Sequence, residues 1–253
     1  MTNKMKFAII AAGEGSRLSQ EGADKPKPLI ELNGEAMIDR LVRIFAKNGA
    51  EEIDIIVNEI HPETKKHVLE LKERLDVPVQ VVCKTTPSSM HSFYELSPLL
   101  KDSKKFCLTT VDTIFREDEF GRYIEAFRNT QCDGMMAVTD YIDDEKPLYV
   151  STDTEMQITG FHDSLENFEK SGVAETSECR YISGGIYCLS ADAIGVLEQC
   201  IESGQARMRN FQRQLVASGL KLKACAFSKI LDVDHISDVE KAEEFLNKGG
   251  KCC

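Results

Sequence analysis

Short apolar runs alternate with segments of helical periodicity along the first half of the chain. The runs cover residues 7–10, 52–58, 77–84 and 106–112. Helical spacing of apolar positions is clearest over residues 37–45. Further helices are predicted at 62–75, at 117–129, and in a segment between them that ends near residue 101. A continuous apolar run is typical of a parallel strand covered on both faces, so the alternation predicts a mostly parallel sheet flanked by helices with right-handed crossovers.

The pattern changes after Gly134, where short strand-like runs follow one another with little helix between them. They cover residues 135–141, 148–154, 156–162 and 181–190, and helices are predicted to return at Ala191 and Met208. No linker, repeat or low-complexity segment divides the chain. We therefore predict an α/β fold with a mixed, mostly parallel sheet, in a single domain of residues 1–253 with a first lobe at about 1–133 and a β-rich second lobe at about 134–253.

Composition is that of an ordinary globular protein. The 253 residues are 42% hydrophobic and 29% charged, and their net charge of −11 argues against a nucleic-acid-binding surface. No apolar run approaches a membrane span or a secretory signal, so we expect a cytoplasmic protein without a membrane partner, either a monomer or a homodimer. The nine cysteines include no Cys-x-x-Cys pair, and those in strand-like runs are predicted to be buried thiols: Cys83, Cys107, Cys188 and Cys225. The terminal Cys252 and Cys253 are assigned no role.

The most informative segment is residues 11–29, AAGEGSRLSQEGADKPKPL, directly after the first predicted strand. Gly13 and Gly15 lack a Cβ, so their backbone can adopt positive φ and its N–H groups can approach an anionic oxygen. Arg17 offers a planar charged fork to phosphate and Lys27 a compact charge. A glycine pair after a strand is often only a turn, but these two cations favour a phosphate site, with Lys25 adding to a local cationic pocket.

Two common nucleotide motifs are excluded. A dinucleotide fingerprint needs a third glycine or alanine where Leu18 stands, and a helix that starts within the glycine run. Because Pro26 and Pro28 follow closely, we expect a long open loop with no helix running through it. A Walker loop is excluded because no glycine is followed by Lys and then Ser or Thr at the required spacing.

The motifs GEGSRL, KPKPL and ELNGEAMID together resemble the amino-terminal signature of the sugar-1-phosphate nucleotidylyltransferases, or NDP-sugar pyrophosphorylases. The chain departs from that pattern at Ala36, where the family carries proline. The resemblance implies a Rossmann-like, GT-A-like nucleotidyltransferase fold with a nucleotide-binding first lobe and an acceptor-binding second lobe. It also implies that Arg17 and Lys27 hold the triphosphate, and that base and phosphates contact the backbone of Ala11, Ala12, Gly13, Glu14, Gly15 and Ser16.

Asp112 stands at the end of the fourth apolar run, where ligands bind in open parallel sheets. A lone aspartate in this place is otherwise a helix cap or turn former. The family places a metal-binding aspartate at this strand end, so the resemblance implies that Asp112 ligates Mg²⁺, an ion that prefers oxygen ligands.

A second carboxylate is expected near the end of the chain, in LDVDHISDVEKAEEFL. Asp232 and Asp234 alternate with apolar residues, so an extended backbone points both to one face. The pattern resembles the family's second metal motif, above all in its cytidylyltransferase branch, and Asp234 is slightly favoured over Asp232. We interpret Asp238 as charge in the first turn of a terminal helix and His235 as a surface or loop residue. That helix is predicted to begin at Ser237, with Glu240 at capping-box spacing.

The substrate-binding segments are less specific. Gly184 and Gly185, within YISGGIYCLS, resemble a family segment that approaches the sugar phosphate, or mark a bulged strand. Gly160 and Phe161 match the start of the family motif Gly-Phe-x-Glu-Lys-Pro. The residues that follow here are His162, Asp163 and Ser164, so the Glu and Lys of the motif are replaced. The hydroxyls of Thr86, Ser88, Ser89 and Ser92 can bind a nucleobase or cap the next helix, so the sequence does not distinguish CTP, UTP, GTP and dTTP.

The resemblance and the charged residues together predict an enzyme that joins an NTP to a sugar 1-phosphate, or a similar phosphate monoester, with Mg²⁺ and release of pyrophosphate. Two alternatives stay open. The first is a CTP-dependent cytidylyltransferase acting on a small alcohol phosphate such as phosphocholine. The second is a catalytically silent module that binds nucleotide sugars.

Overall fold

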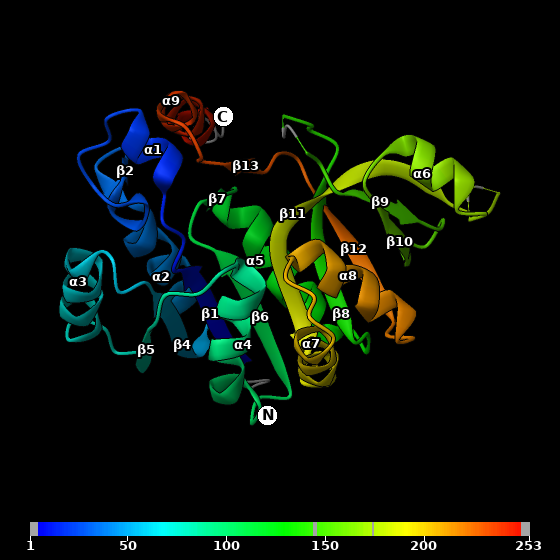
Figure 1. Cartoon of the computed structure of the whole chain (residues 1–253), viewed down its shortest axis with the longest axis horizontal. Helices are drawn as coiled ribbons and strands as arrows, with labels where there is room; N and C mark the ends of the chain where they lie inside the picture. The colour runs from blue at the N-terminus through cyan, green and yellow to red at the C-terminus, as the bar shows by residue number, and fades with distance from the viewer. Residues whose placement is uncertain (1–4, 144–145, 174, 249–253) are drawn as a thin grey trace.

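A continuous twisted sheet runs through the whole molecule (Figure 1). The structure is a computed structural model and describes residues 5–143, 146–173 and 175–248. Within those residues the main sheet has nine strands, of which seven follow the order β10-β9-β11-β6-β1-β4-β5, while β8 pairs with β11 and β12. The single-domain organisation stays a prediction.

The first half of the chain forms the parallel part of this sheet. β6, β1, β4 and β5 lie side by side in parallel register. Their bounds are β1 Met5–Ala11, β4 Ala50–Val57, β5 Val79–Cys83 and β6 Lys105–Thr110. In β1, Phe7 and Ile9 belong to one buried cluster and Ala8 and Ile10 to the other, which explains the continuous apolar run.

The second half adds mostly antiparallel strands. β11 pairs antiparallel with β6, β8 and β9, whereas β12 is parallel to β8. The bounds are β8 Gly134–Thr139, β9 Tyr149–Thr152, β10 Ile158–His162, β11 Glu178–Ser190 and β12 Leu222–Phe227. The predicted α/β class with a mixed, mostly parallel sheet and a β-rich second half is confirmed.

Helices cover both faces of the sheet. Phe45 of α2 stacks on Phe120 of α5 at 5.6 Å between ring centroids on one face, and Phe93 of α4 meets Phe211 of α8 on the other. The helices with these contacts are α2 Met37–Lys47, α4 Ser89–Leu100, α5 Glu117–Asn129 and α8 Met208–Ala217. The remaining long helices are α3 Pro62–Lys72, α7 Asp192–Glu202 and α9 Ile236–Asn247. No helix among the described residues is long and apolar enough to cross a membrane.

Several short elements complete the chain. A 3₁₀ turn, η1, covers Lys27–Leu29. The short helices are α1 Ser16–Gln20 and α6 Leu165–Lys170. The short strands are β2 Glu31–Leu32, β3 Glu35–Ala36, β7 Thr113–Ile114 and β13 Leu231–Asp232.

The structure corrects several local predictions. The loop after β1 does contain a helix, α1, which ends at Gln20 well before the prolines. The helix predicted to reach residue 75 ends at Lys72. Among the cysteines, Cys107 and Cys188 are buried as predicted, whereas Cys83 and Cys225 are partly exposed. Cys252 and Cys253 lie outside the described residues.

The terminal helix α9 is capped differently from the prediction. His235 is its N-cap, and its capping box is completed by Asp238, not by Ser237 and Glu240. The Asp238 carboxylate accepts the backbone N–H of His235 at 2.9 Å. This bond is consistent with the interpretation of Asp238 as first-turn charge, and it gives His235 a structural role.

Candidate active site

The glycine loop and Lys27 are in direct contact at the carboxyl end of β1. Gly15 has φ +63°, and a Cβ added there would lie 3.0 Å from the Cβ of Lys27. A side chain at position 15 would therefore be strained by both its backbone conformation and its neighbour. Glycine at this position lets η1 approach the loop and bring Lys27 beneath it.

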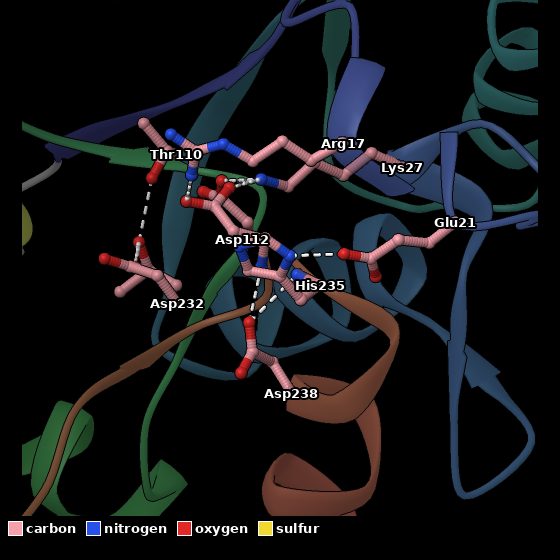
Figure 2. A network of polar contacts seen from close by, with 10 residues as sticks. Arg17, Glu21, Lys27, Thr110, Asp112, Asp232, His235 and Asp238 are labelled. Atoms are coloured by element: carbon pink, nitrogen blue, oxygen red, sulfur yellow. Dashed lines mark hydrogen bonds and ion pairs between the residues drawn. The ribbon is translucent and has the colours of Figure 1, made fainter. Parts of the chain in front are cut away.

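The ammonium of Lys27 lies between two carboxylates from distant parts of the chain (Figure 2). It forms an ion pair with Asp112 and another with Asp234, the latter at 2.6 Å from Nζ to Oδ1. The Lys27 side chain is 10% exposed. Burial lowers its pKa, but the charges of Asp112 and Asp234 more than offset this and hold the pKa above its usual value, so Lys27 is a cation at neutral pH.

Arg17 contacts the Asp234 carboxylate from the solvent side. Its Nη1 donates to Asp234 Oδ2 at 2.9 Å. The two cations predicted to hold a triphosphate thus share Asp234, a residue predicted to hold metal. Lys25, expected to add to this cationic pocket, pairs with Glu31 instead.

The segment carrying Asp232 and Asp234 runs directly beside Asp112. β13 pairs with β7, and the N–H of Val233 donates to the carbonyl of Asp112 at 3.1 Å. Thr113 Oγ1 donates to Asp232 Oδ1 at 3.4 Å. Three predicted metal ligands, Asp112, Asp232 and Asp234, consequently line one cavity.

These residues suit a hard divalent cation. Asp112 and Asp234 already converge on one compact cation, the Lys27 ammonium, and offer only oxygen donors. No group of three or more His, Cys, Asp or Glu side chains within the described part of the chain could hold a metal ion on its own. Mg²⁺ typically uses one or two carboxylates and completes its coordination with water and substrate phosphates, so the donor set fits Mg²⁺.

A cavity of about 650 Å³ opens beside this cluster. It brings together every residue that the sequence analysis placed at the nucleotide, along with Asp112 and Asp234. Its predicted lining residues are Ala11, Ala12, Gly13, Glu14, Gly15, Ser16, Arg17, Lys27, Ser88 and Ser89. Thr86 and Ser92, whose hydroxyls were also candidates for the base, line it too, whereas Thr110 was not predicted.

Ser88 has a capping role as well as a position in this cavity. It is the N-cap of α4, and its Oγ accepts the backbone N–H of His91. Capping explains this serine without a ligand. Ser89 begins the helix.

A second cavity joins the carboxylates to the β-rich half. Gly185 lines it with Ser183 and Gln212, and Gly184 lines an adjoining cavity. The register of β11 against β8 shifts between Ser183 and Tyr187, so the two glycines lie in an irregular segment of this strand pair. They make close approaches within the protein: a Cβ on Gly184 would lie 2.2 Å from Ile230 Cδ1, and one on Gly185 3.1 Å from Thr113 Oγ1.

Sequence reasoning missed the cations of this second cavity, Lys146, Arg207 and Arg209. Arg209 pairs with Asp163 at 2.5 Å, and Arg213, one turn along α8, pairs with the same carboxylate at 2.7 Å. The sequence did contain one signal: Asp163 stands where the family motif carries the Glu of Glu-Lys-Pro. Its partners, however, lie 46 and more residues further along the chain.

Hydrogen bonds join the start of α9 to Glu21, the residue directly after α1. His235 Nδ1 lies 2.5 Å from Glu21 Oε1, and the other Glu21 oxygen accepts the N–H of Ile236 at 2.8 Å. The hydrogen bond with Glu21 raises the pKa of His235 above its usual value. These contacts hold Asp234, the residue before His235, against Arg17 and Lys27.

The fold and this paired set of cations and carboxylates define an α/β nucleotidyltransferase domain. Residues 7–218 match the model of the MobA-like NTP transferase domain, and the chain belongs to that family. Members of the family act on an NTP and a phosphate-containing acceptor and generally use a divalent metal ion.

Similarity to individual proteins is distant but extends along the chain. A bifunctional IPC transferase and DIPP synthase of Rubrobacter xylanophilus is 25% identical over 94% of this chain and 51% of its own length, so the chain spans about half of that relative. The inositol-1-phosphate CTP transferase of T. maritima superposes with a TM-score of 0.77 at 18% identity, covering 99% of both chains. The CTP:phosphocholine cytidylyltransferase of Streptococcus pneumoniae superposes with a TM-score of 0.70 at 18% identity, covering 96% of this chain and 99% of the other.

Proposed function

We propose that this protein transfers a nucleotidyl group from an NTP to a phosphate monoester, with release of pyrophosphate and dependence on Mg²⁺. The observation that carries the proposal is the position of Lys27 between Asp112 and Asp234, with Arg17 on the outer side of Asp234. Such a cluster combines cations for a triphosphate with carboxylates for a metal at the meeting point of two cavities.

The chemistry requires two anions to approach each other. The acceptor phosphate is already a nucleophile at neutral pH, so binding and charge compensation matter more than a general base. Arg17 and Lys27 would bind the triphosphate and stabilise the charge that develops on the departing pyrophosphate. Asp112 and Asp234, with Asp232 beside them, would hold Mg²⁺, which offsets phosphate charge at the site of attack.

The glycine loop and the start of α4 would hold the nucleotide. Residues 11–16 line the 650 Å³ cavity together with Ser88 and Ser89. The irregular segment at Gly184 and Gly185 would bring the acceptor to the carboxylates from the second cavity. We favour a sugar 1-phosphate as acceptor.

A second candidate is CTP-dependent transfer to a small alcohol phosphate. The observation that favours it is the replacement of the sugar-linked Glu-Lys pair by Asp163 and Ser164, together with the engagement of Asp163 by Arg209 and Arg213. The similarity to transferases whose names specify inositol 1-phosphate and phosphocholine points in the same direction.

A pyrophosphate-release screen tests both candidates. CTP, UTP, GTP, dTTP and ATP are each combined with sugar 1-phosphates, inositol 1-phosphate and phosphocholine, with and without Mg²⁺. Release with a sugar 1-phosphate supports the first candidate, and release only with CTP and an alcohol phosphate supports the second. No release with any pair, despite measurable binding of a nucleotide sugar, would leave the silent binding module as the better description.

A further inference from the structure

The turn after β4 contacts the glycine loop from the side away from the nucleotide cavity. Asn58, directly after β4, is buried, with 3% of its surface exposed. Its Nδ2 donates to the carbonyl of Gly13 at 3.0 Å and, at a longer 3.5 Å, to that of Ala12. Three residues later, His61 Nε2 lies 3.4 Å from the carbonyl of Glu14.

The orientation of the Asn58 amide is fixed by its own partners. The backbone N–H of His61 donates to Asn58 Oδ1 at 3.0 Å, so the oxygen faces the turn and the NH₂ group faces the loop. A carbonyl can only accept, so both contacts to Ala12 and Gly13 need this orientation. An aspartate would keep the oxygen that His61 uses but would place a second oxygen against two carbonyls.

Three successive carbonyls of the glycine loop therefore point toward residues 58–61. In a trans peptide the N–H of the next residue points the opposite way from the carbonyl, and the described residues contain no cis peptide. The N–H groups of Gly13, Glu14 and Gly15 are thus directed away from Asn58 and His61. Neither of those two side chains is among the described residues that line the nucleotide cavity, whereas all three loop residues are.

Those three N–H groups have no hydrogen-bond acceptor among the described residues. Backbone N–H groups that converge on a cavity form a site for anionic oxygens, and such a site acts best when it is preorganised. We propose that Asn58, assisted by His61, is the positioning residue of this site. It holds the loop carbonyls back so that the loop N–H groups face a polyphosphate. This inference rests on the proposed function, because it assigns the ligand of the loop as the phosphates of the NTP.

The test measures binding and kinetics of Asn58→Ala, Asn58→Ser and Asn58→Asp. Isothermal titration with inorganic tripolyphosphate and with the preferred NTP is combined with steady-state kinetics. We expect Kd for tripolyphosphate and KM for the NTP to rise at least tenfold in Asn58→Asp and less in Asn58→Ser, whose hydroxyl keeps one donor. The KM for the acceptor should change less than twofold, since the loop does not line the second cavity.

A matched control separates positioning from loss of stability. Ile56→Val removes one methyl group from a buried side chain of β4, two residues before Asn58, and should leave tripolyphosphate affinity unchanged at a melting temperature similar to those of the Asn58 variants. Wild-type tripolyphosphate affinity in both Asn58→Ala and Asn58→Ser would overturn the inference, as would equal increases of the two KM values. Absence of pyrophosphate release by the wild-type protein with every substrate pair would contradict the proposed function instead, and the tripolyphosphate titration would still decide the role of Asn58.

Discussion

Arg17 and Asp234 are 217 positions apart in the sequence, yet the guanidinium of one donates to the carboxylate of the other at 2.9 Å. The side chains are 57% and 44% exposed. An exposed pair of this kind contributes little to stability, with typical values of about 0.2–1 kcal/mol. We therefore expect Arg17→Gln to change the free energy of unfolding by less than about 1 kcal/mol while lowering kcat/KM for the NTP by at least tenfold, as measured by urea unfolding and pyrophosphate release. A large loss of stability with normal kinetics would assign Arg17 a structural role.

Asp112 is expected to be essential for metal-dependent turnover. Asp112→Asn keeps the shape of the side chain but removes one of the two charges that meet at Lys27. Pyrophosphate release should fall by about two orders of magnitude or more, as a lost charge at a metal site implies. Asp118→Asn, on an exposed part of α5, is the control. Pyrophosphate release by Asp112→Asn at the wild-type rate and ordinary Mg²⁺ concentration would contradict the assignment of Asp112 as a metal ligand.

Lys27 is expected to compete with the metal in the absence of nucleotide. Its ammonium lies where the two carboxylates converge, so Lys27→Met should bind Mg²⁺ more tightly than the wild type when no NTP is present. The same variant should raise KM for the NTP at least tenfold, because the cation for the triphosphate is gone. Mg²⁺-dependent thermal shifts measure the first effect and kinetics the second. Lys25→Met, whose lysine pairs with Glu31 at the surface, should show neither effect.

Gly184 is expected to tolerate a side chain only if Ile230 is shortened. A Cβ at position 184 would lie 2.2 Å from Ile230 Cδ1, so Gly184→Ala should cost about 1–3 kcal/mol of stability through overpacking. Ile230→Val removes Cδ1, and the next nearest atom of that side chain lies 3.4 Å away. The double variant should recover part of the loss in urea unfolding. No recovery would place the strain elsewhere, for example at the carbonyl of Ala137.

Asp54 is expected to make stability depend on pH. The residue is fully buried in β4, and neither carboxylate oxygen has a hydrogen-bond partner among the described residues. Burial, and then the charge of Glu52, raise the pKa of Asp54 from 3.8 to about 7. Between those two values the folded state holds a proton that the unfolded state has released, so the free energy of unfolding falls as pH rises toward 7 and levels off above it.

Asp54→Asn should remove this slope. The variant should be more stable than the wild type at pH 8 by a few kcal/mol, since each pKa unit corresponds to about 1.4 kcal/mol. Urea unfolding at pH 5 and pH 8 measures the difference, with Asp76→Asn at the surface as control. Equal slopes in wild type and Asp54→Asn would show that another group dominates this pH range.

Local chemistry explains why much of the fold was predictable. Apolar runs buried on both faces and helices with one apolar stripe are readable without tertiary contacts, and β1 and α2 are examples. Helix ends were less predictable. The cap of α9 is His235 because Glu21, from the other end of the chain, anchors that histidine, and this contact left no trace in the spacing of Ser237 and Glu240.

The sequence by itself determined the chemical inventory: a glycine loop after a strand, Arg17 and Lys27 behind it, and aspartates at Asp112, Asp232 and Asp234. Residue type and the positions of strand ends carry that information locally. Only the tertiary structure decided that Lys27 joins Asp112 to Asp234, that Asp163 holds Arg209 and Arg213, and that Asn58 turns the loop carbonyls away from the cavity. Those relationships depend on which strands become neighbours, a result of packing the whole sheet that no local pattern encodes.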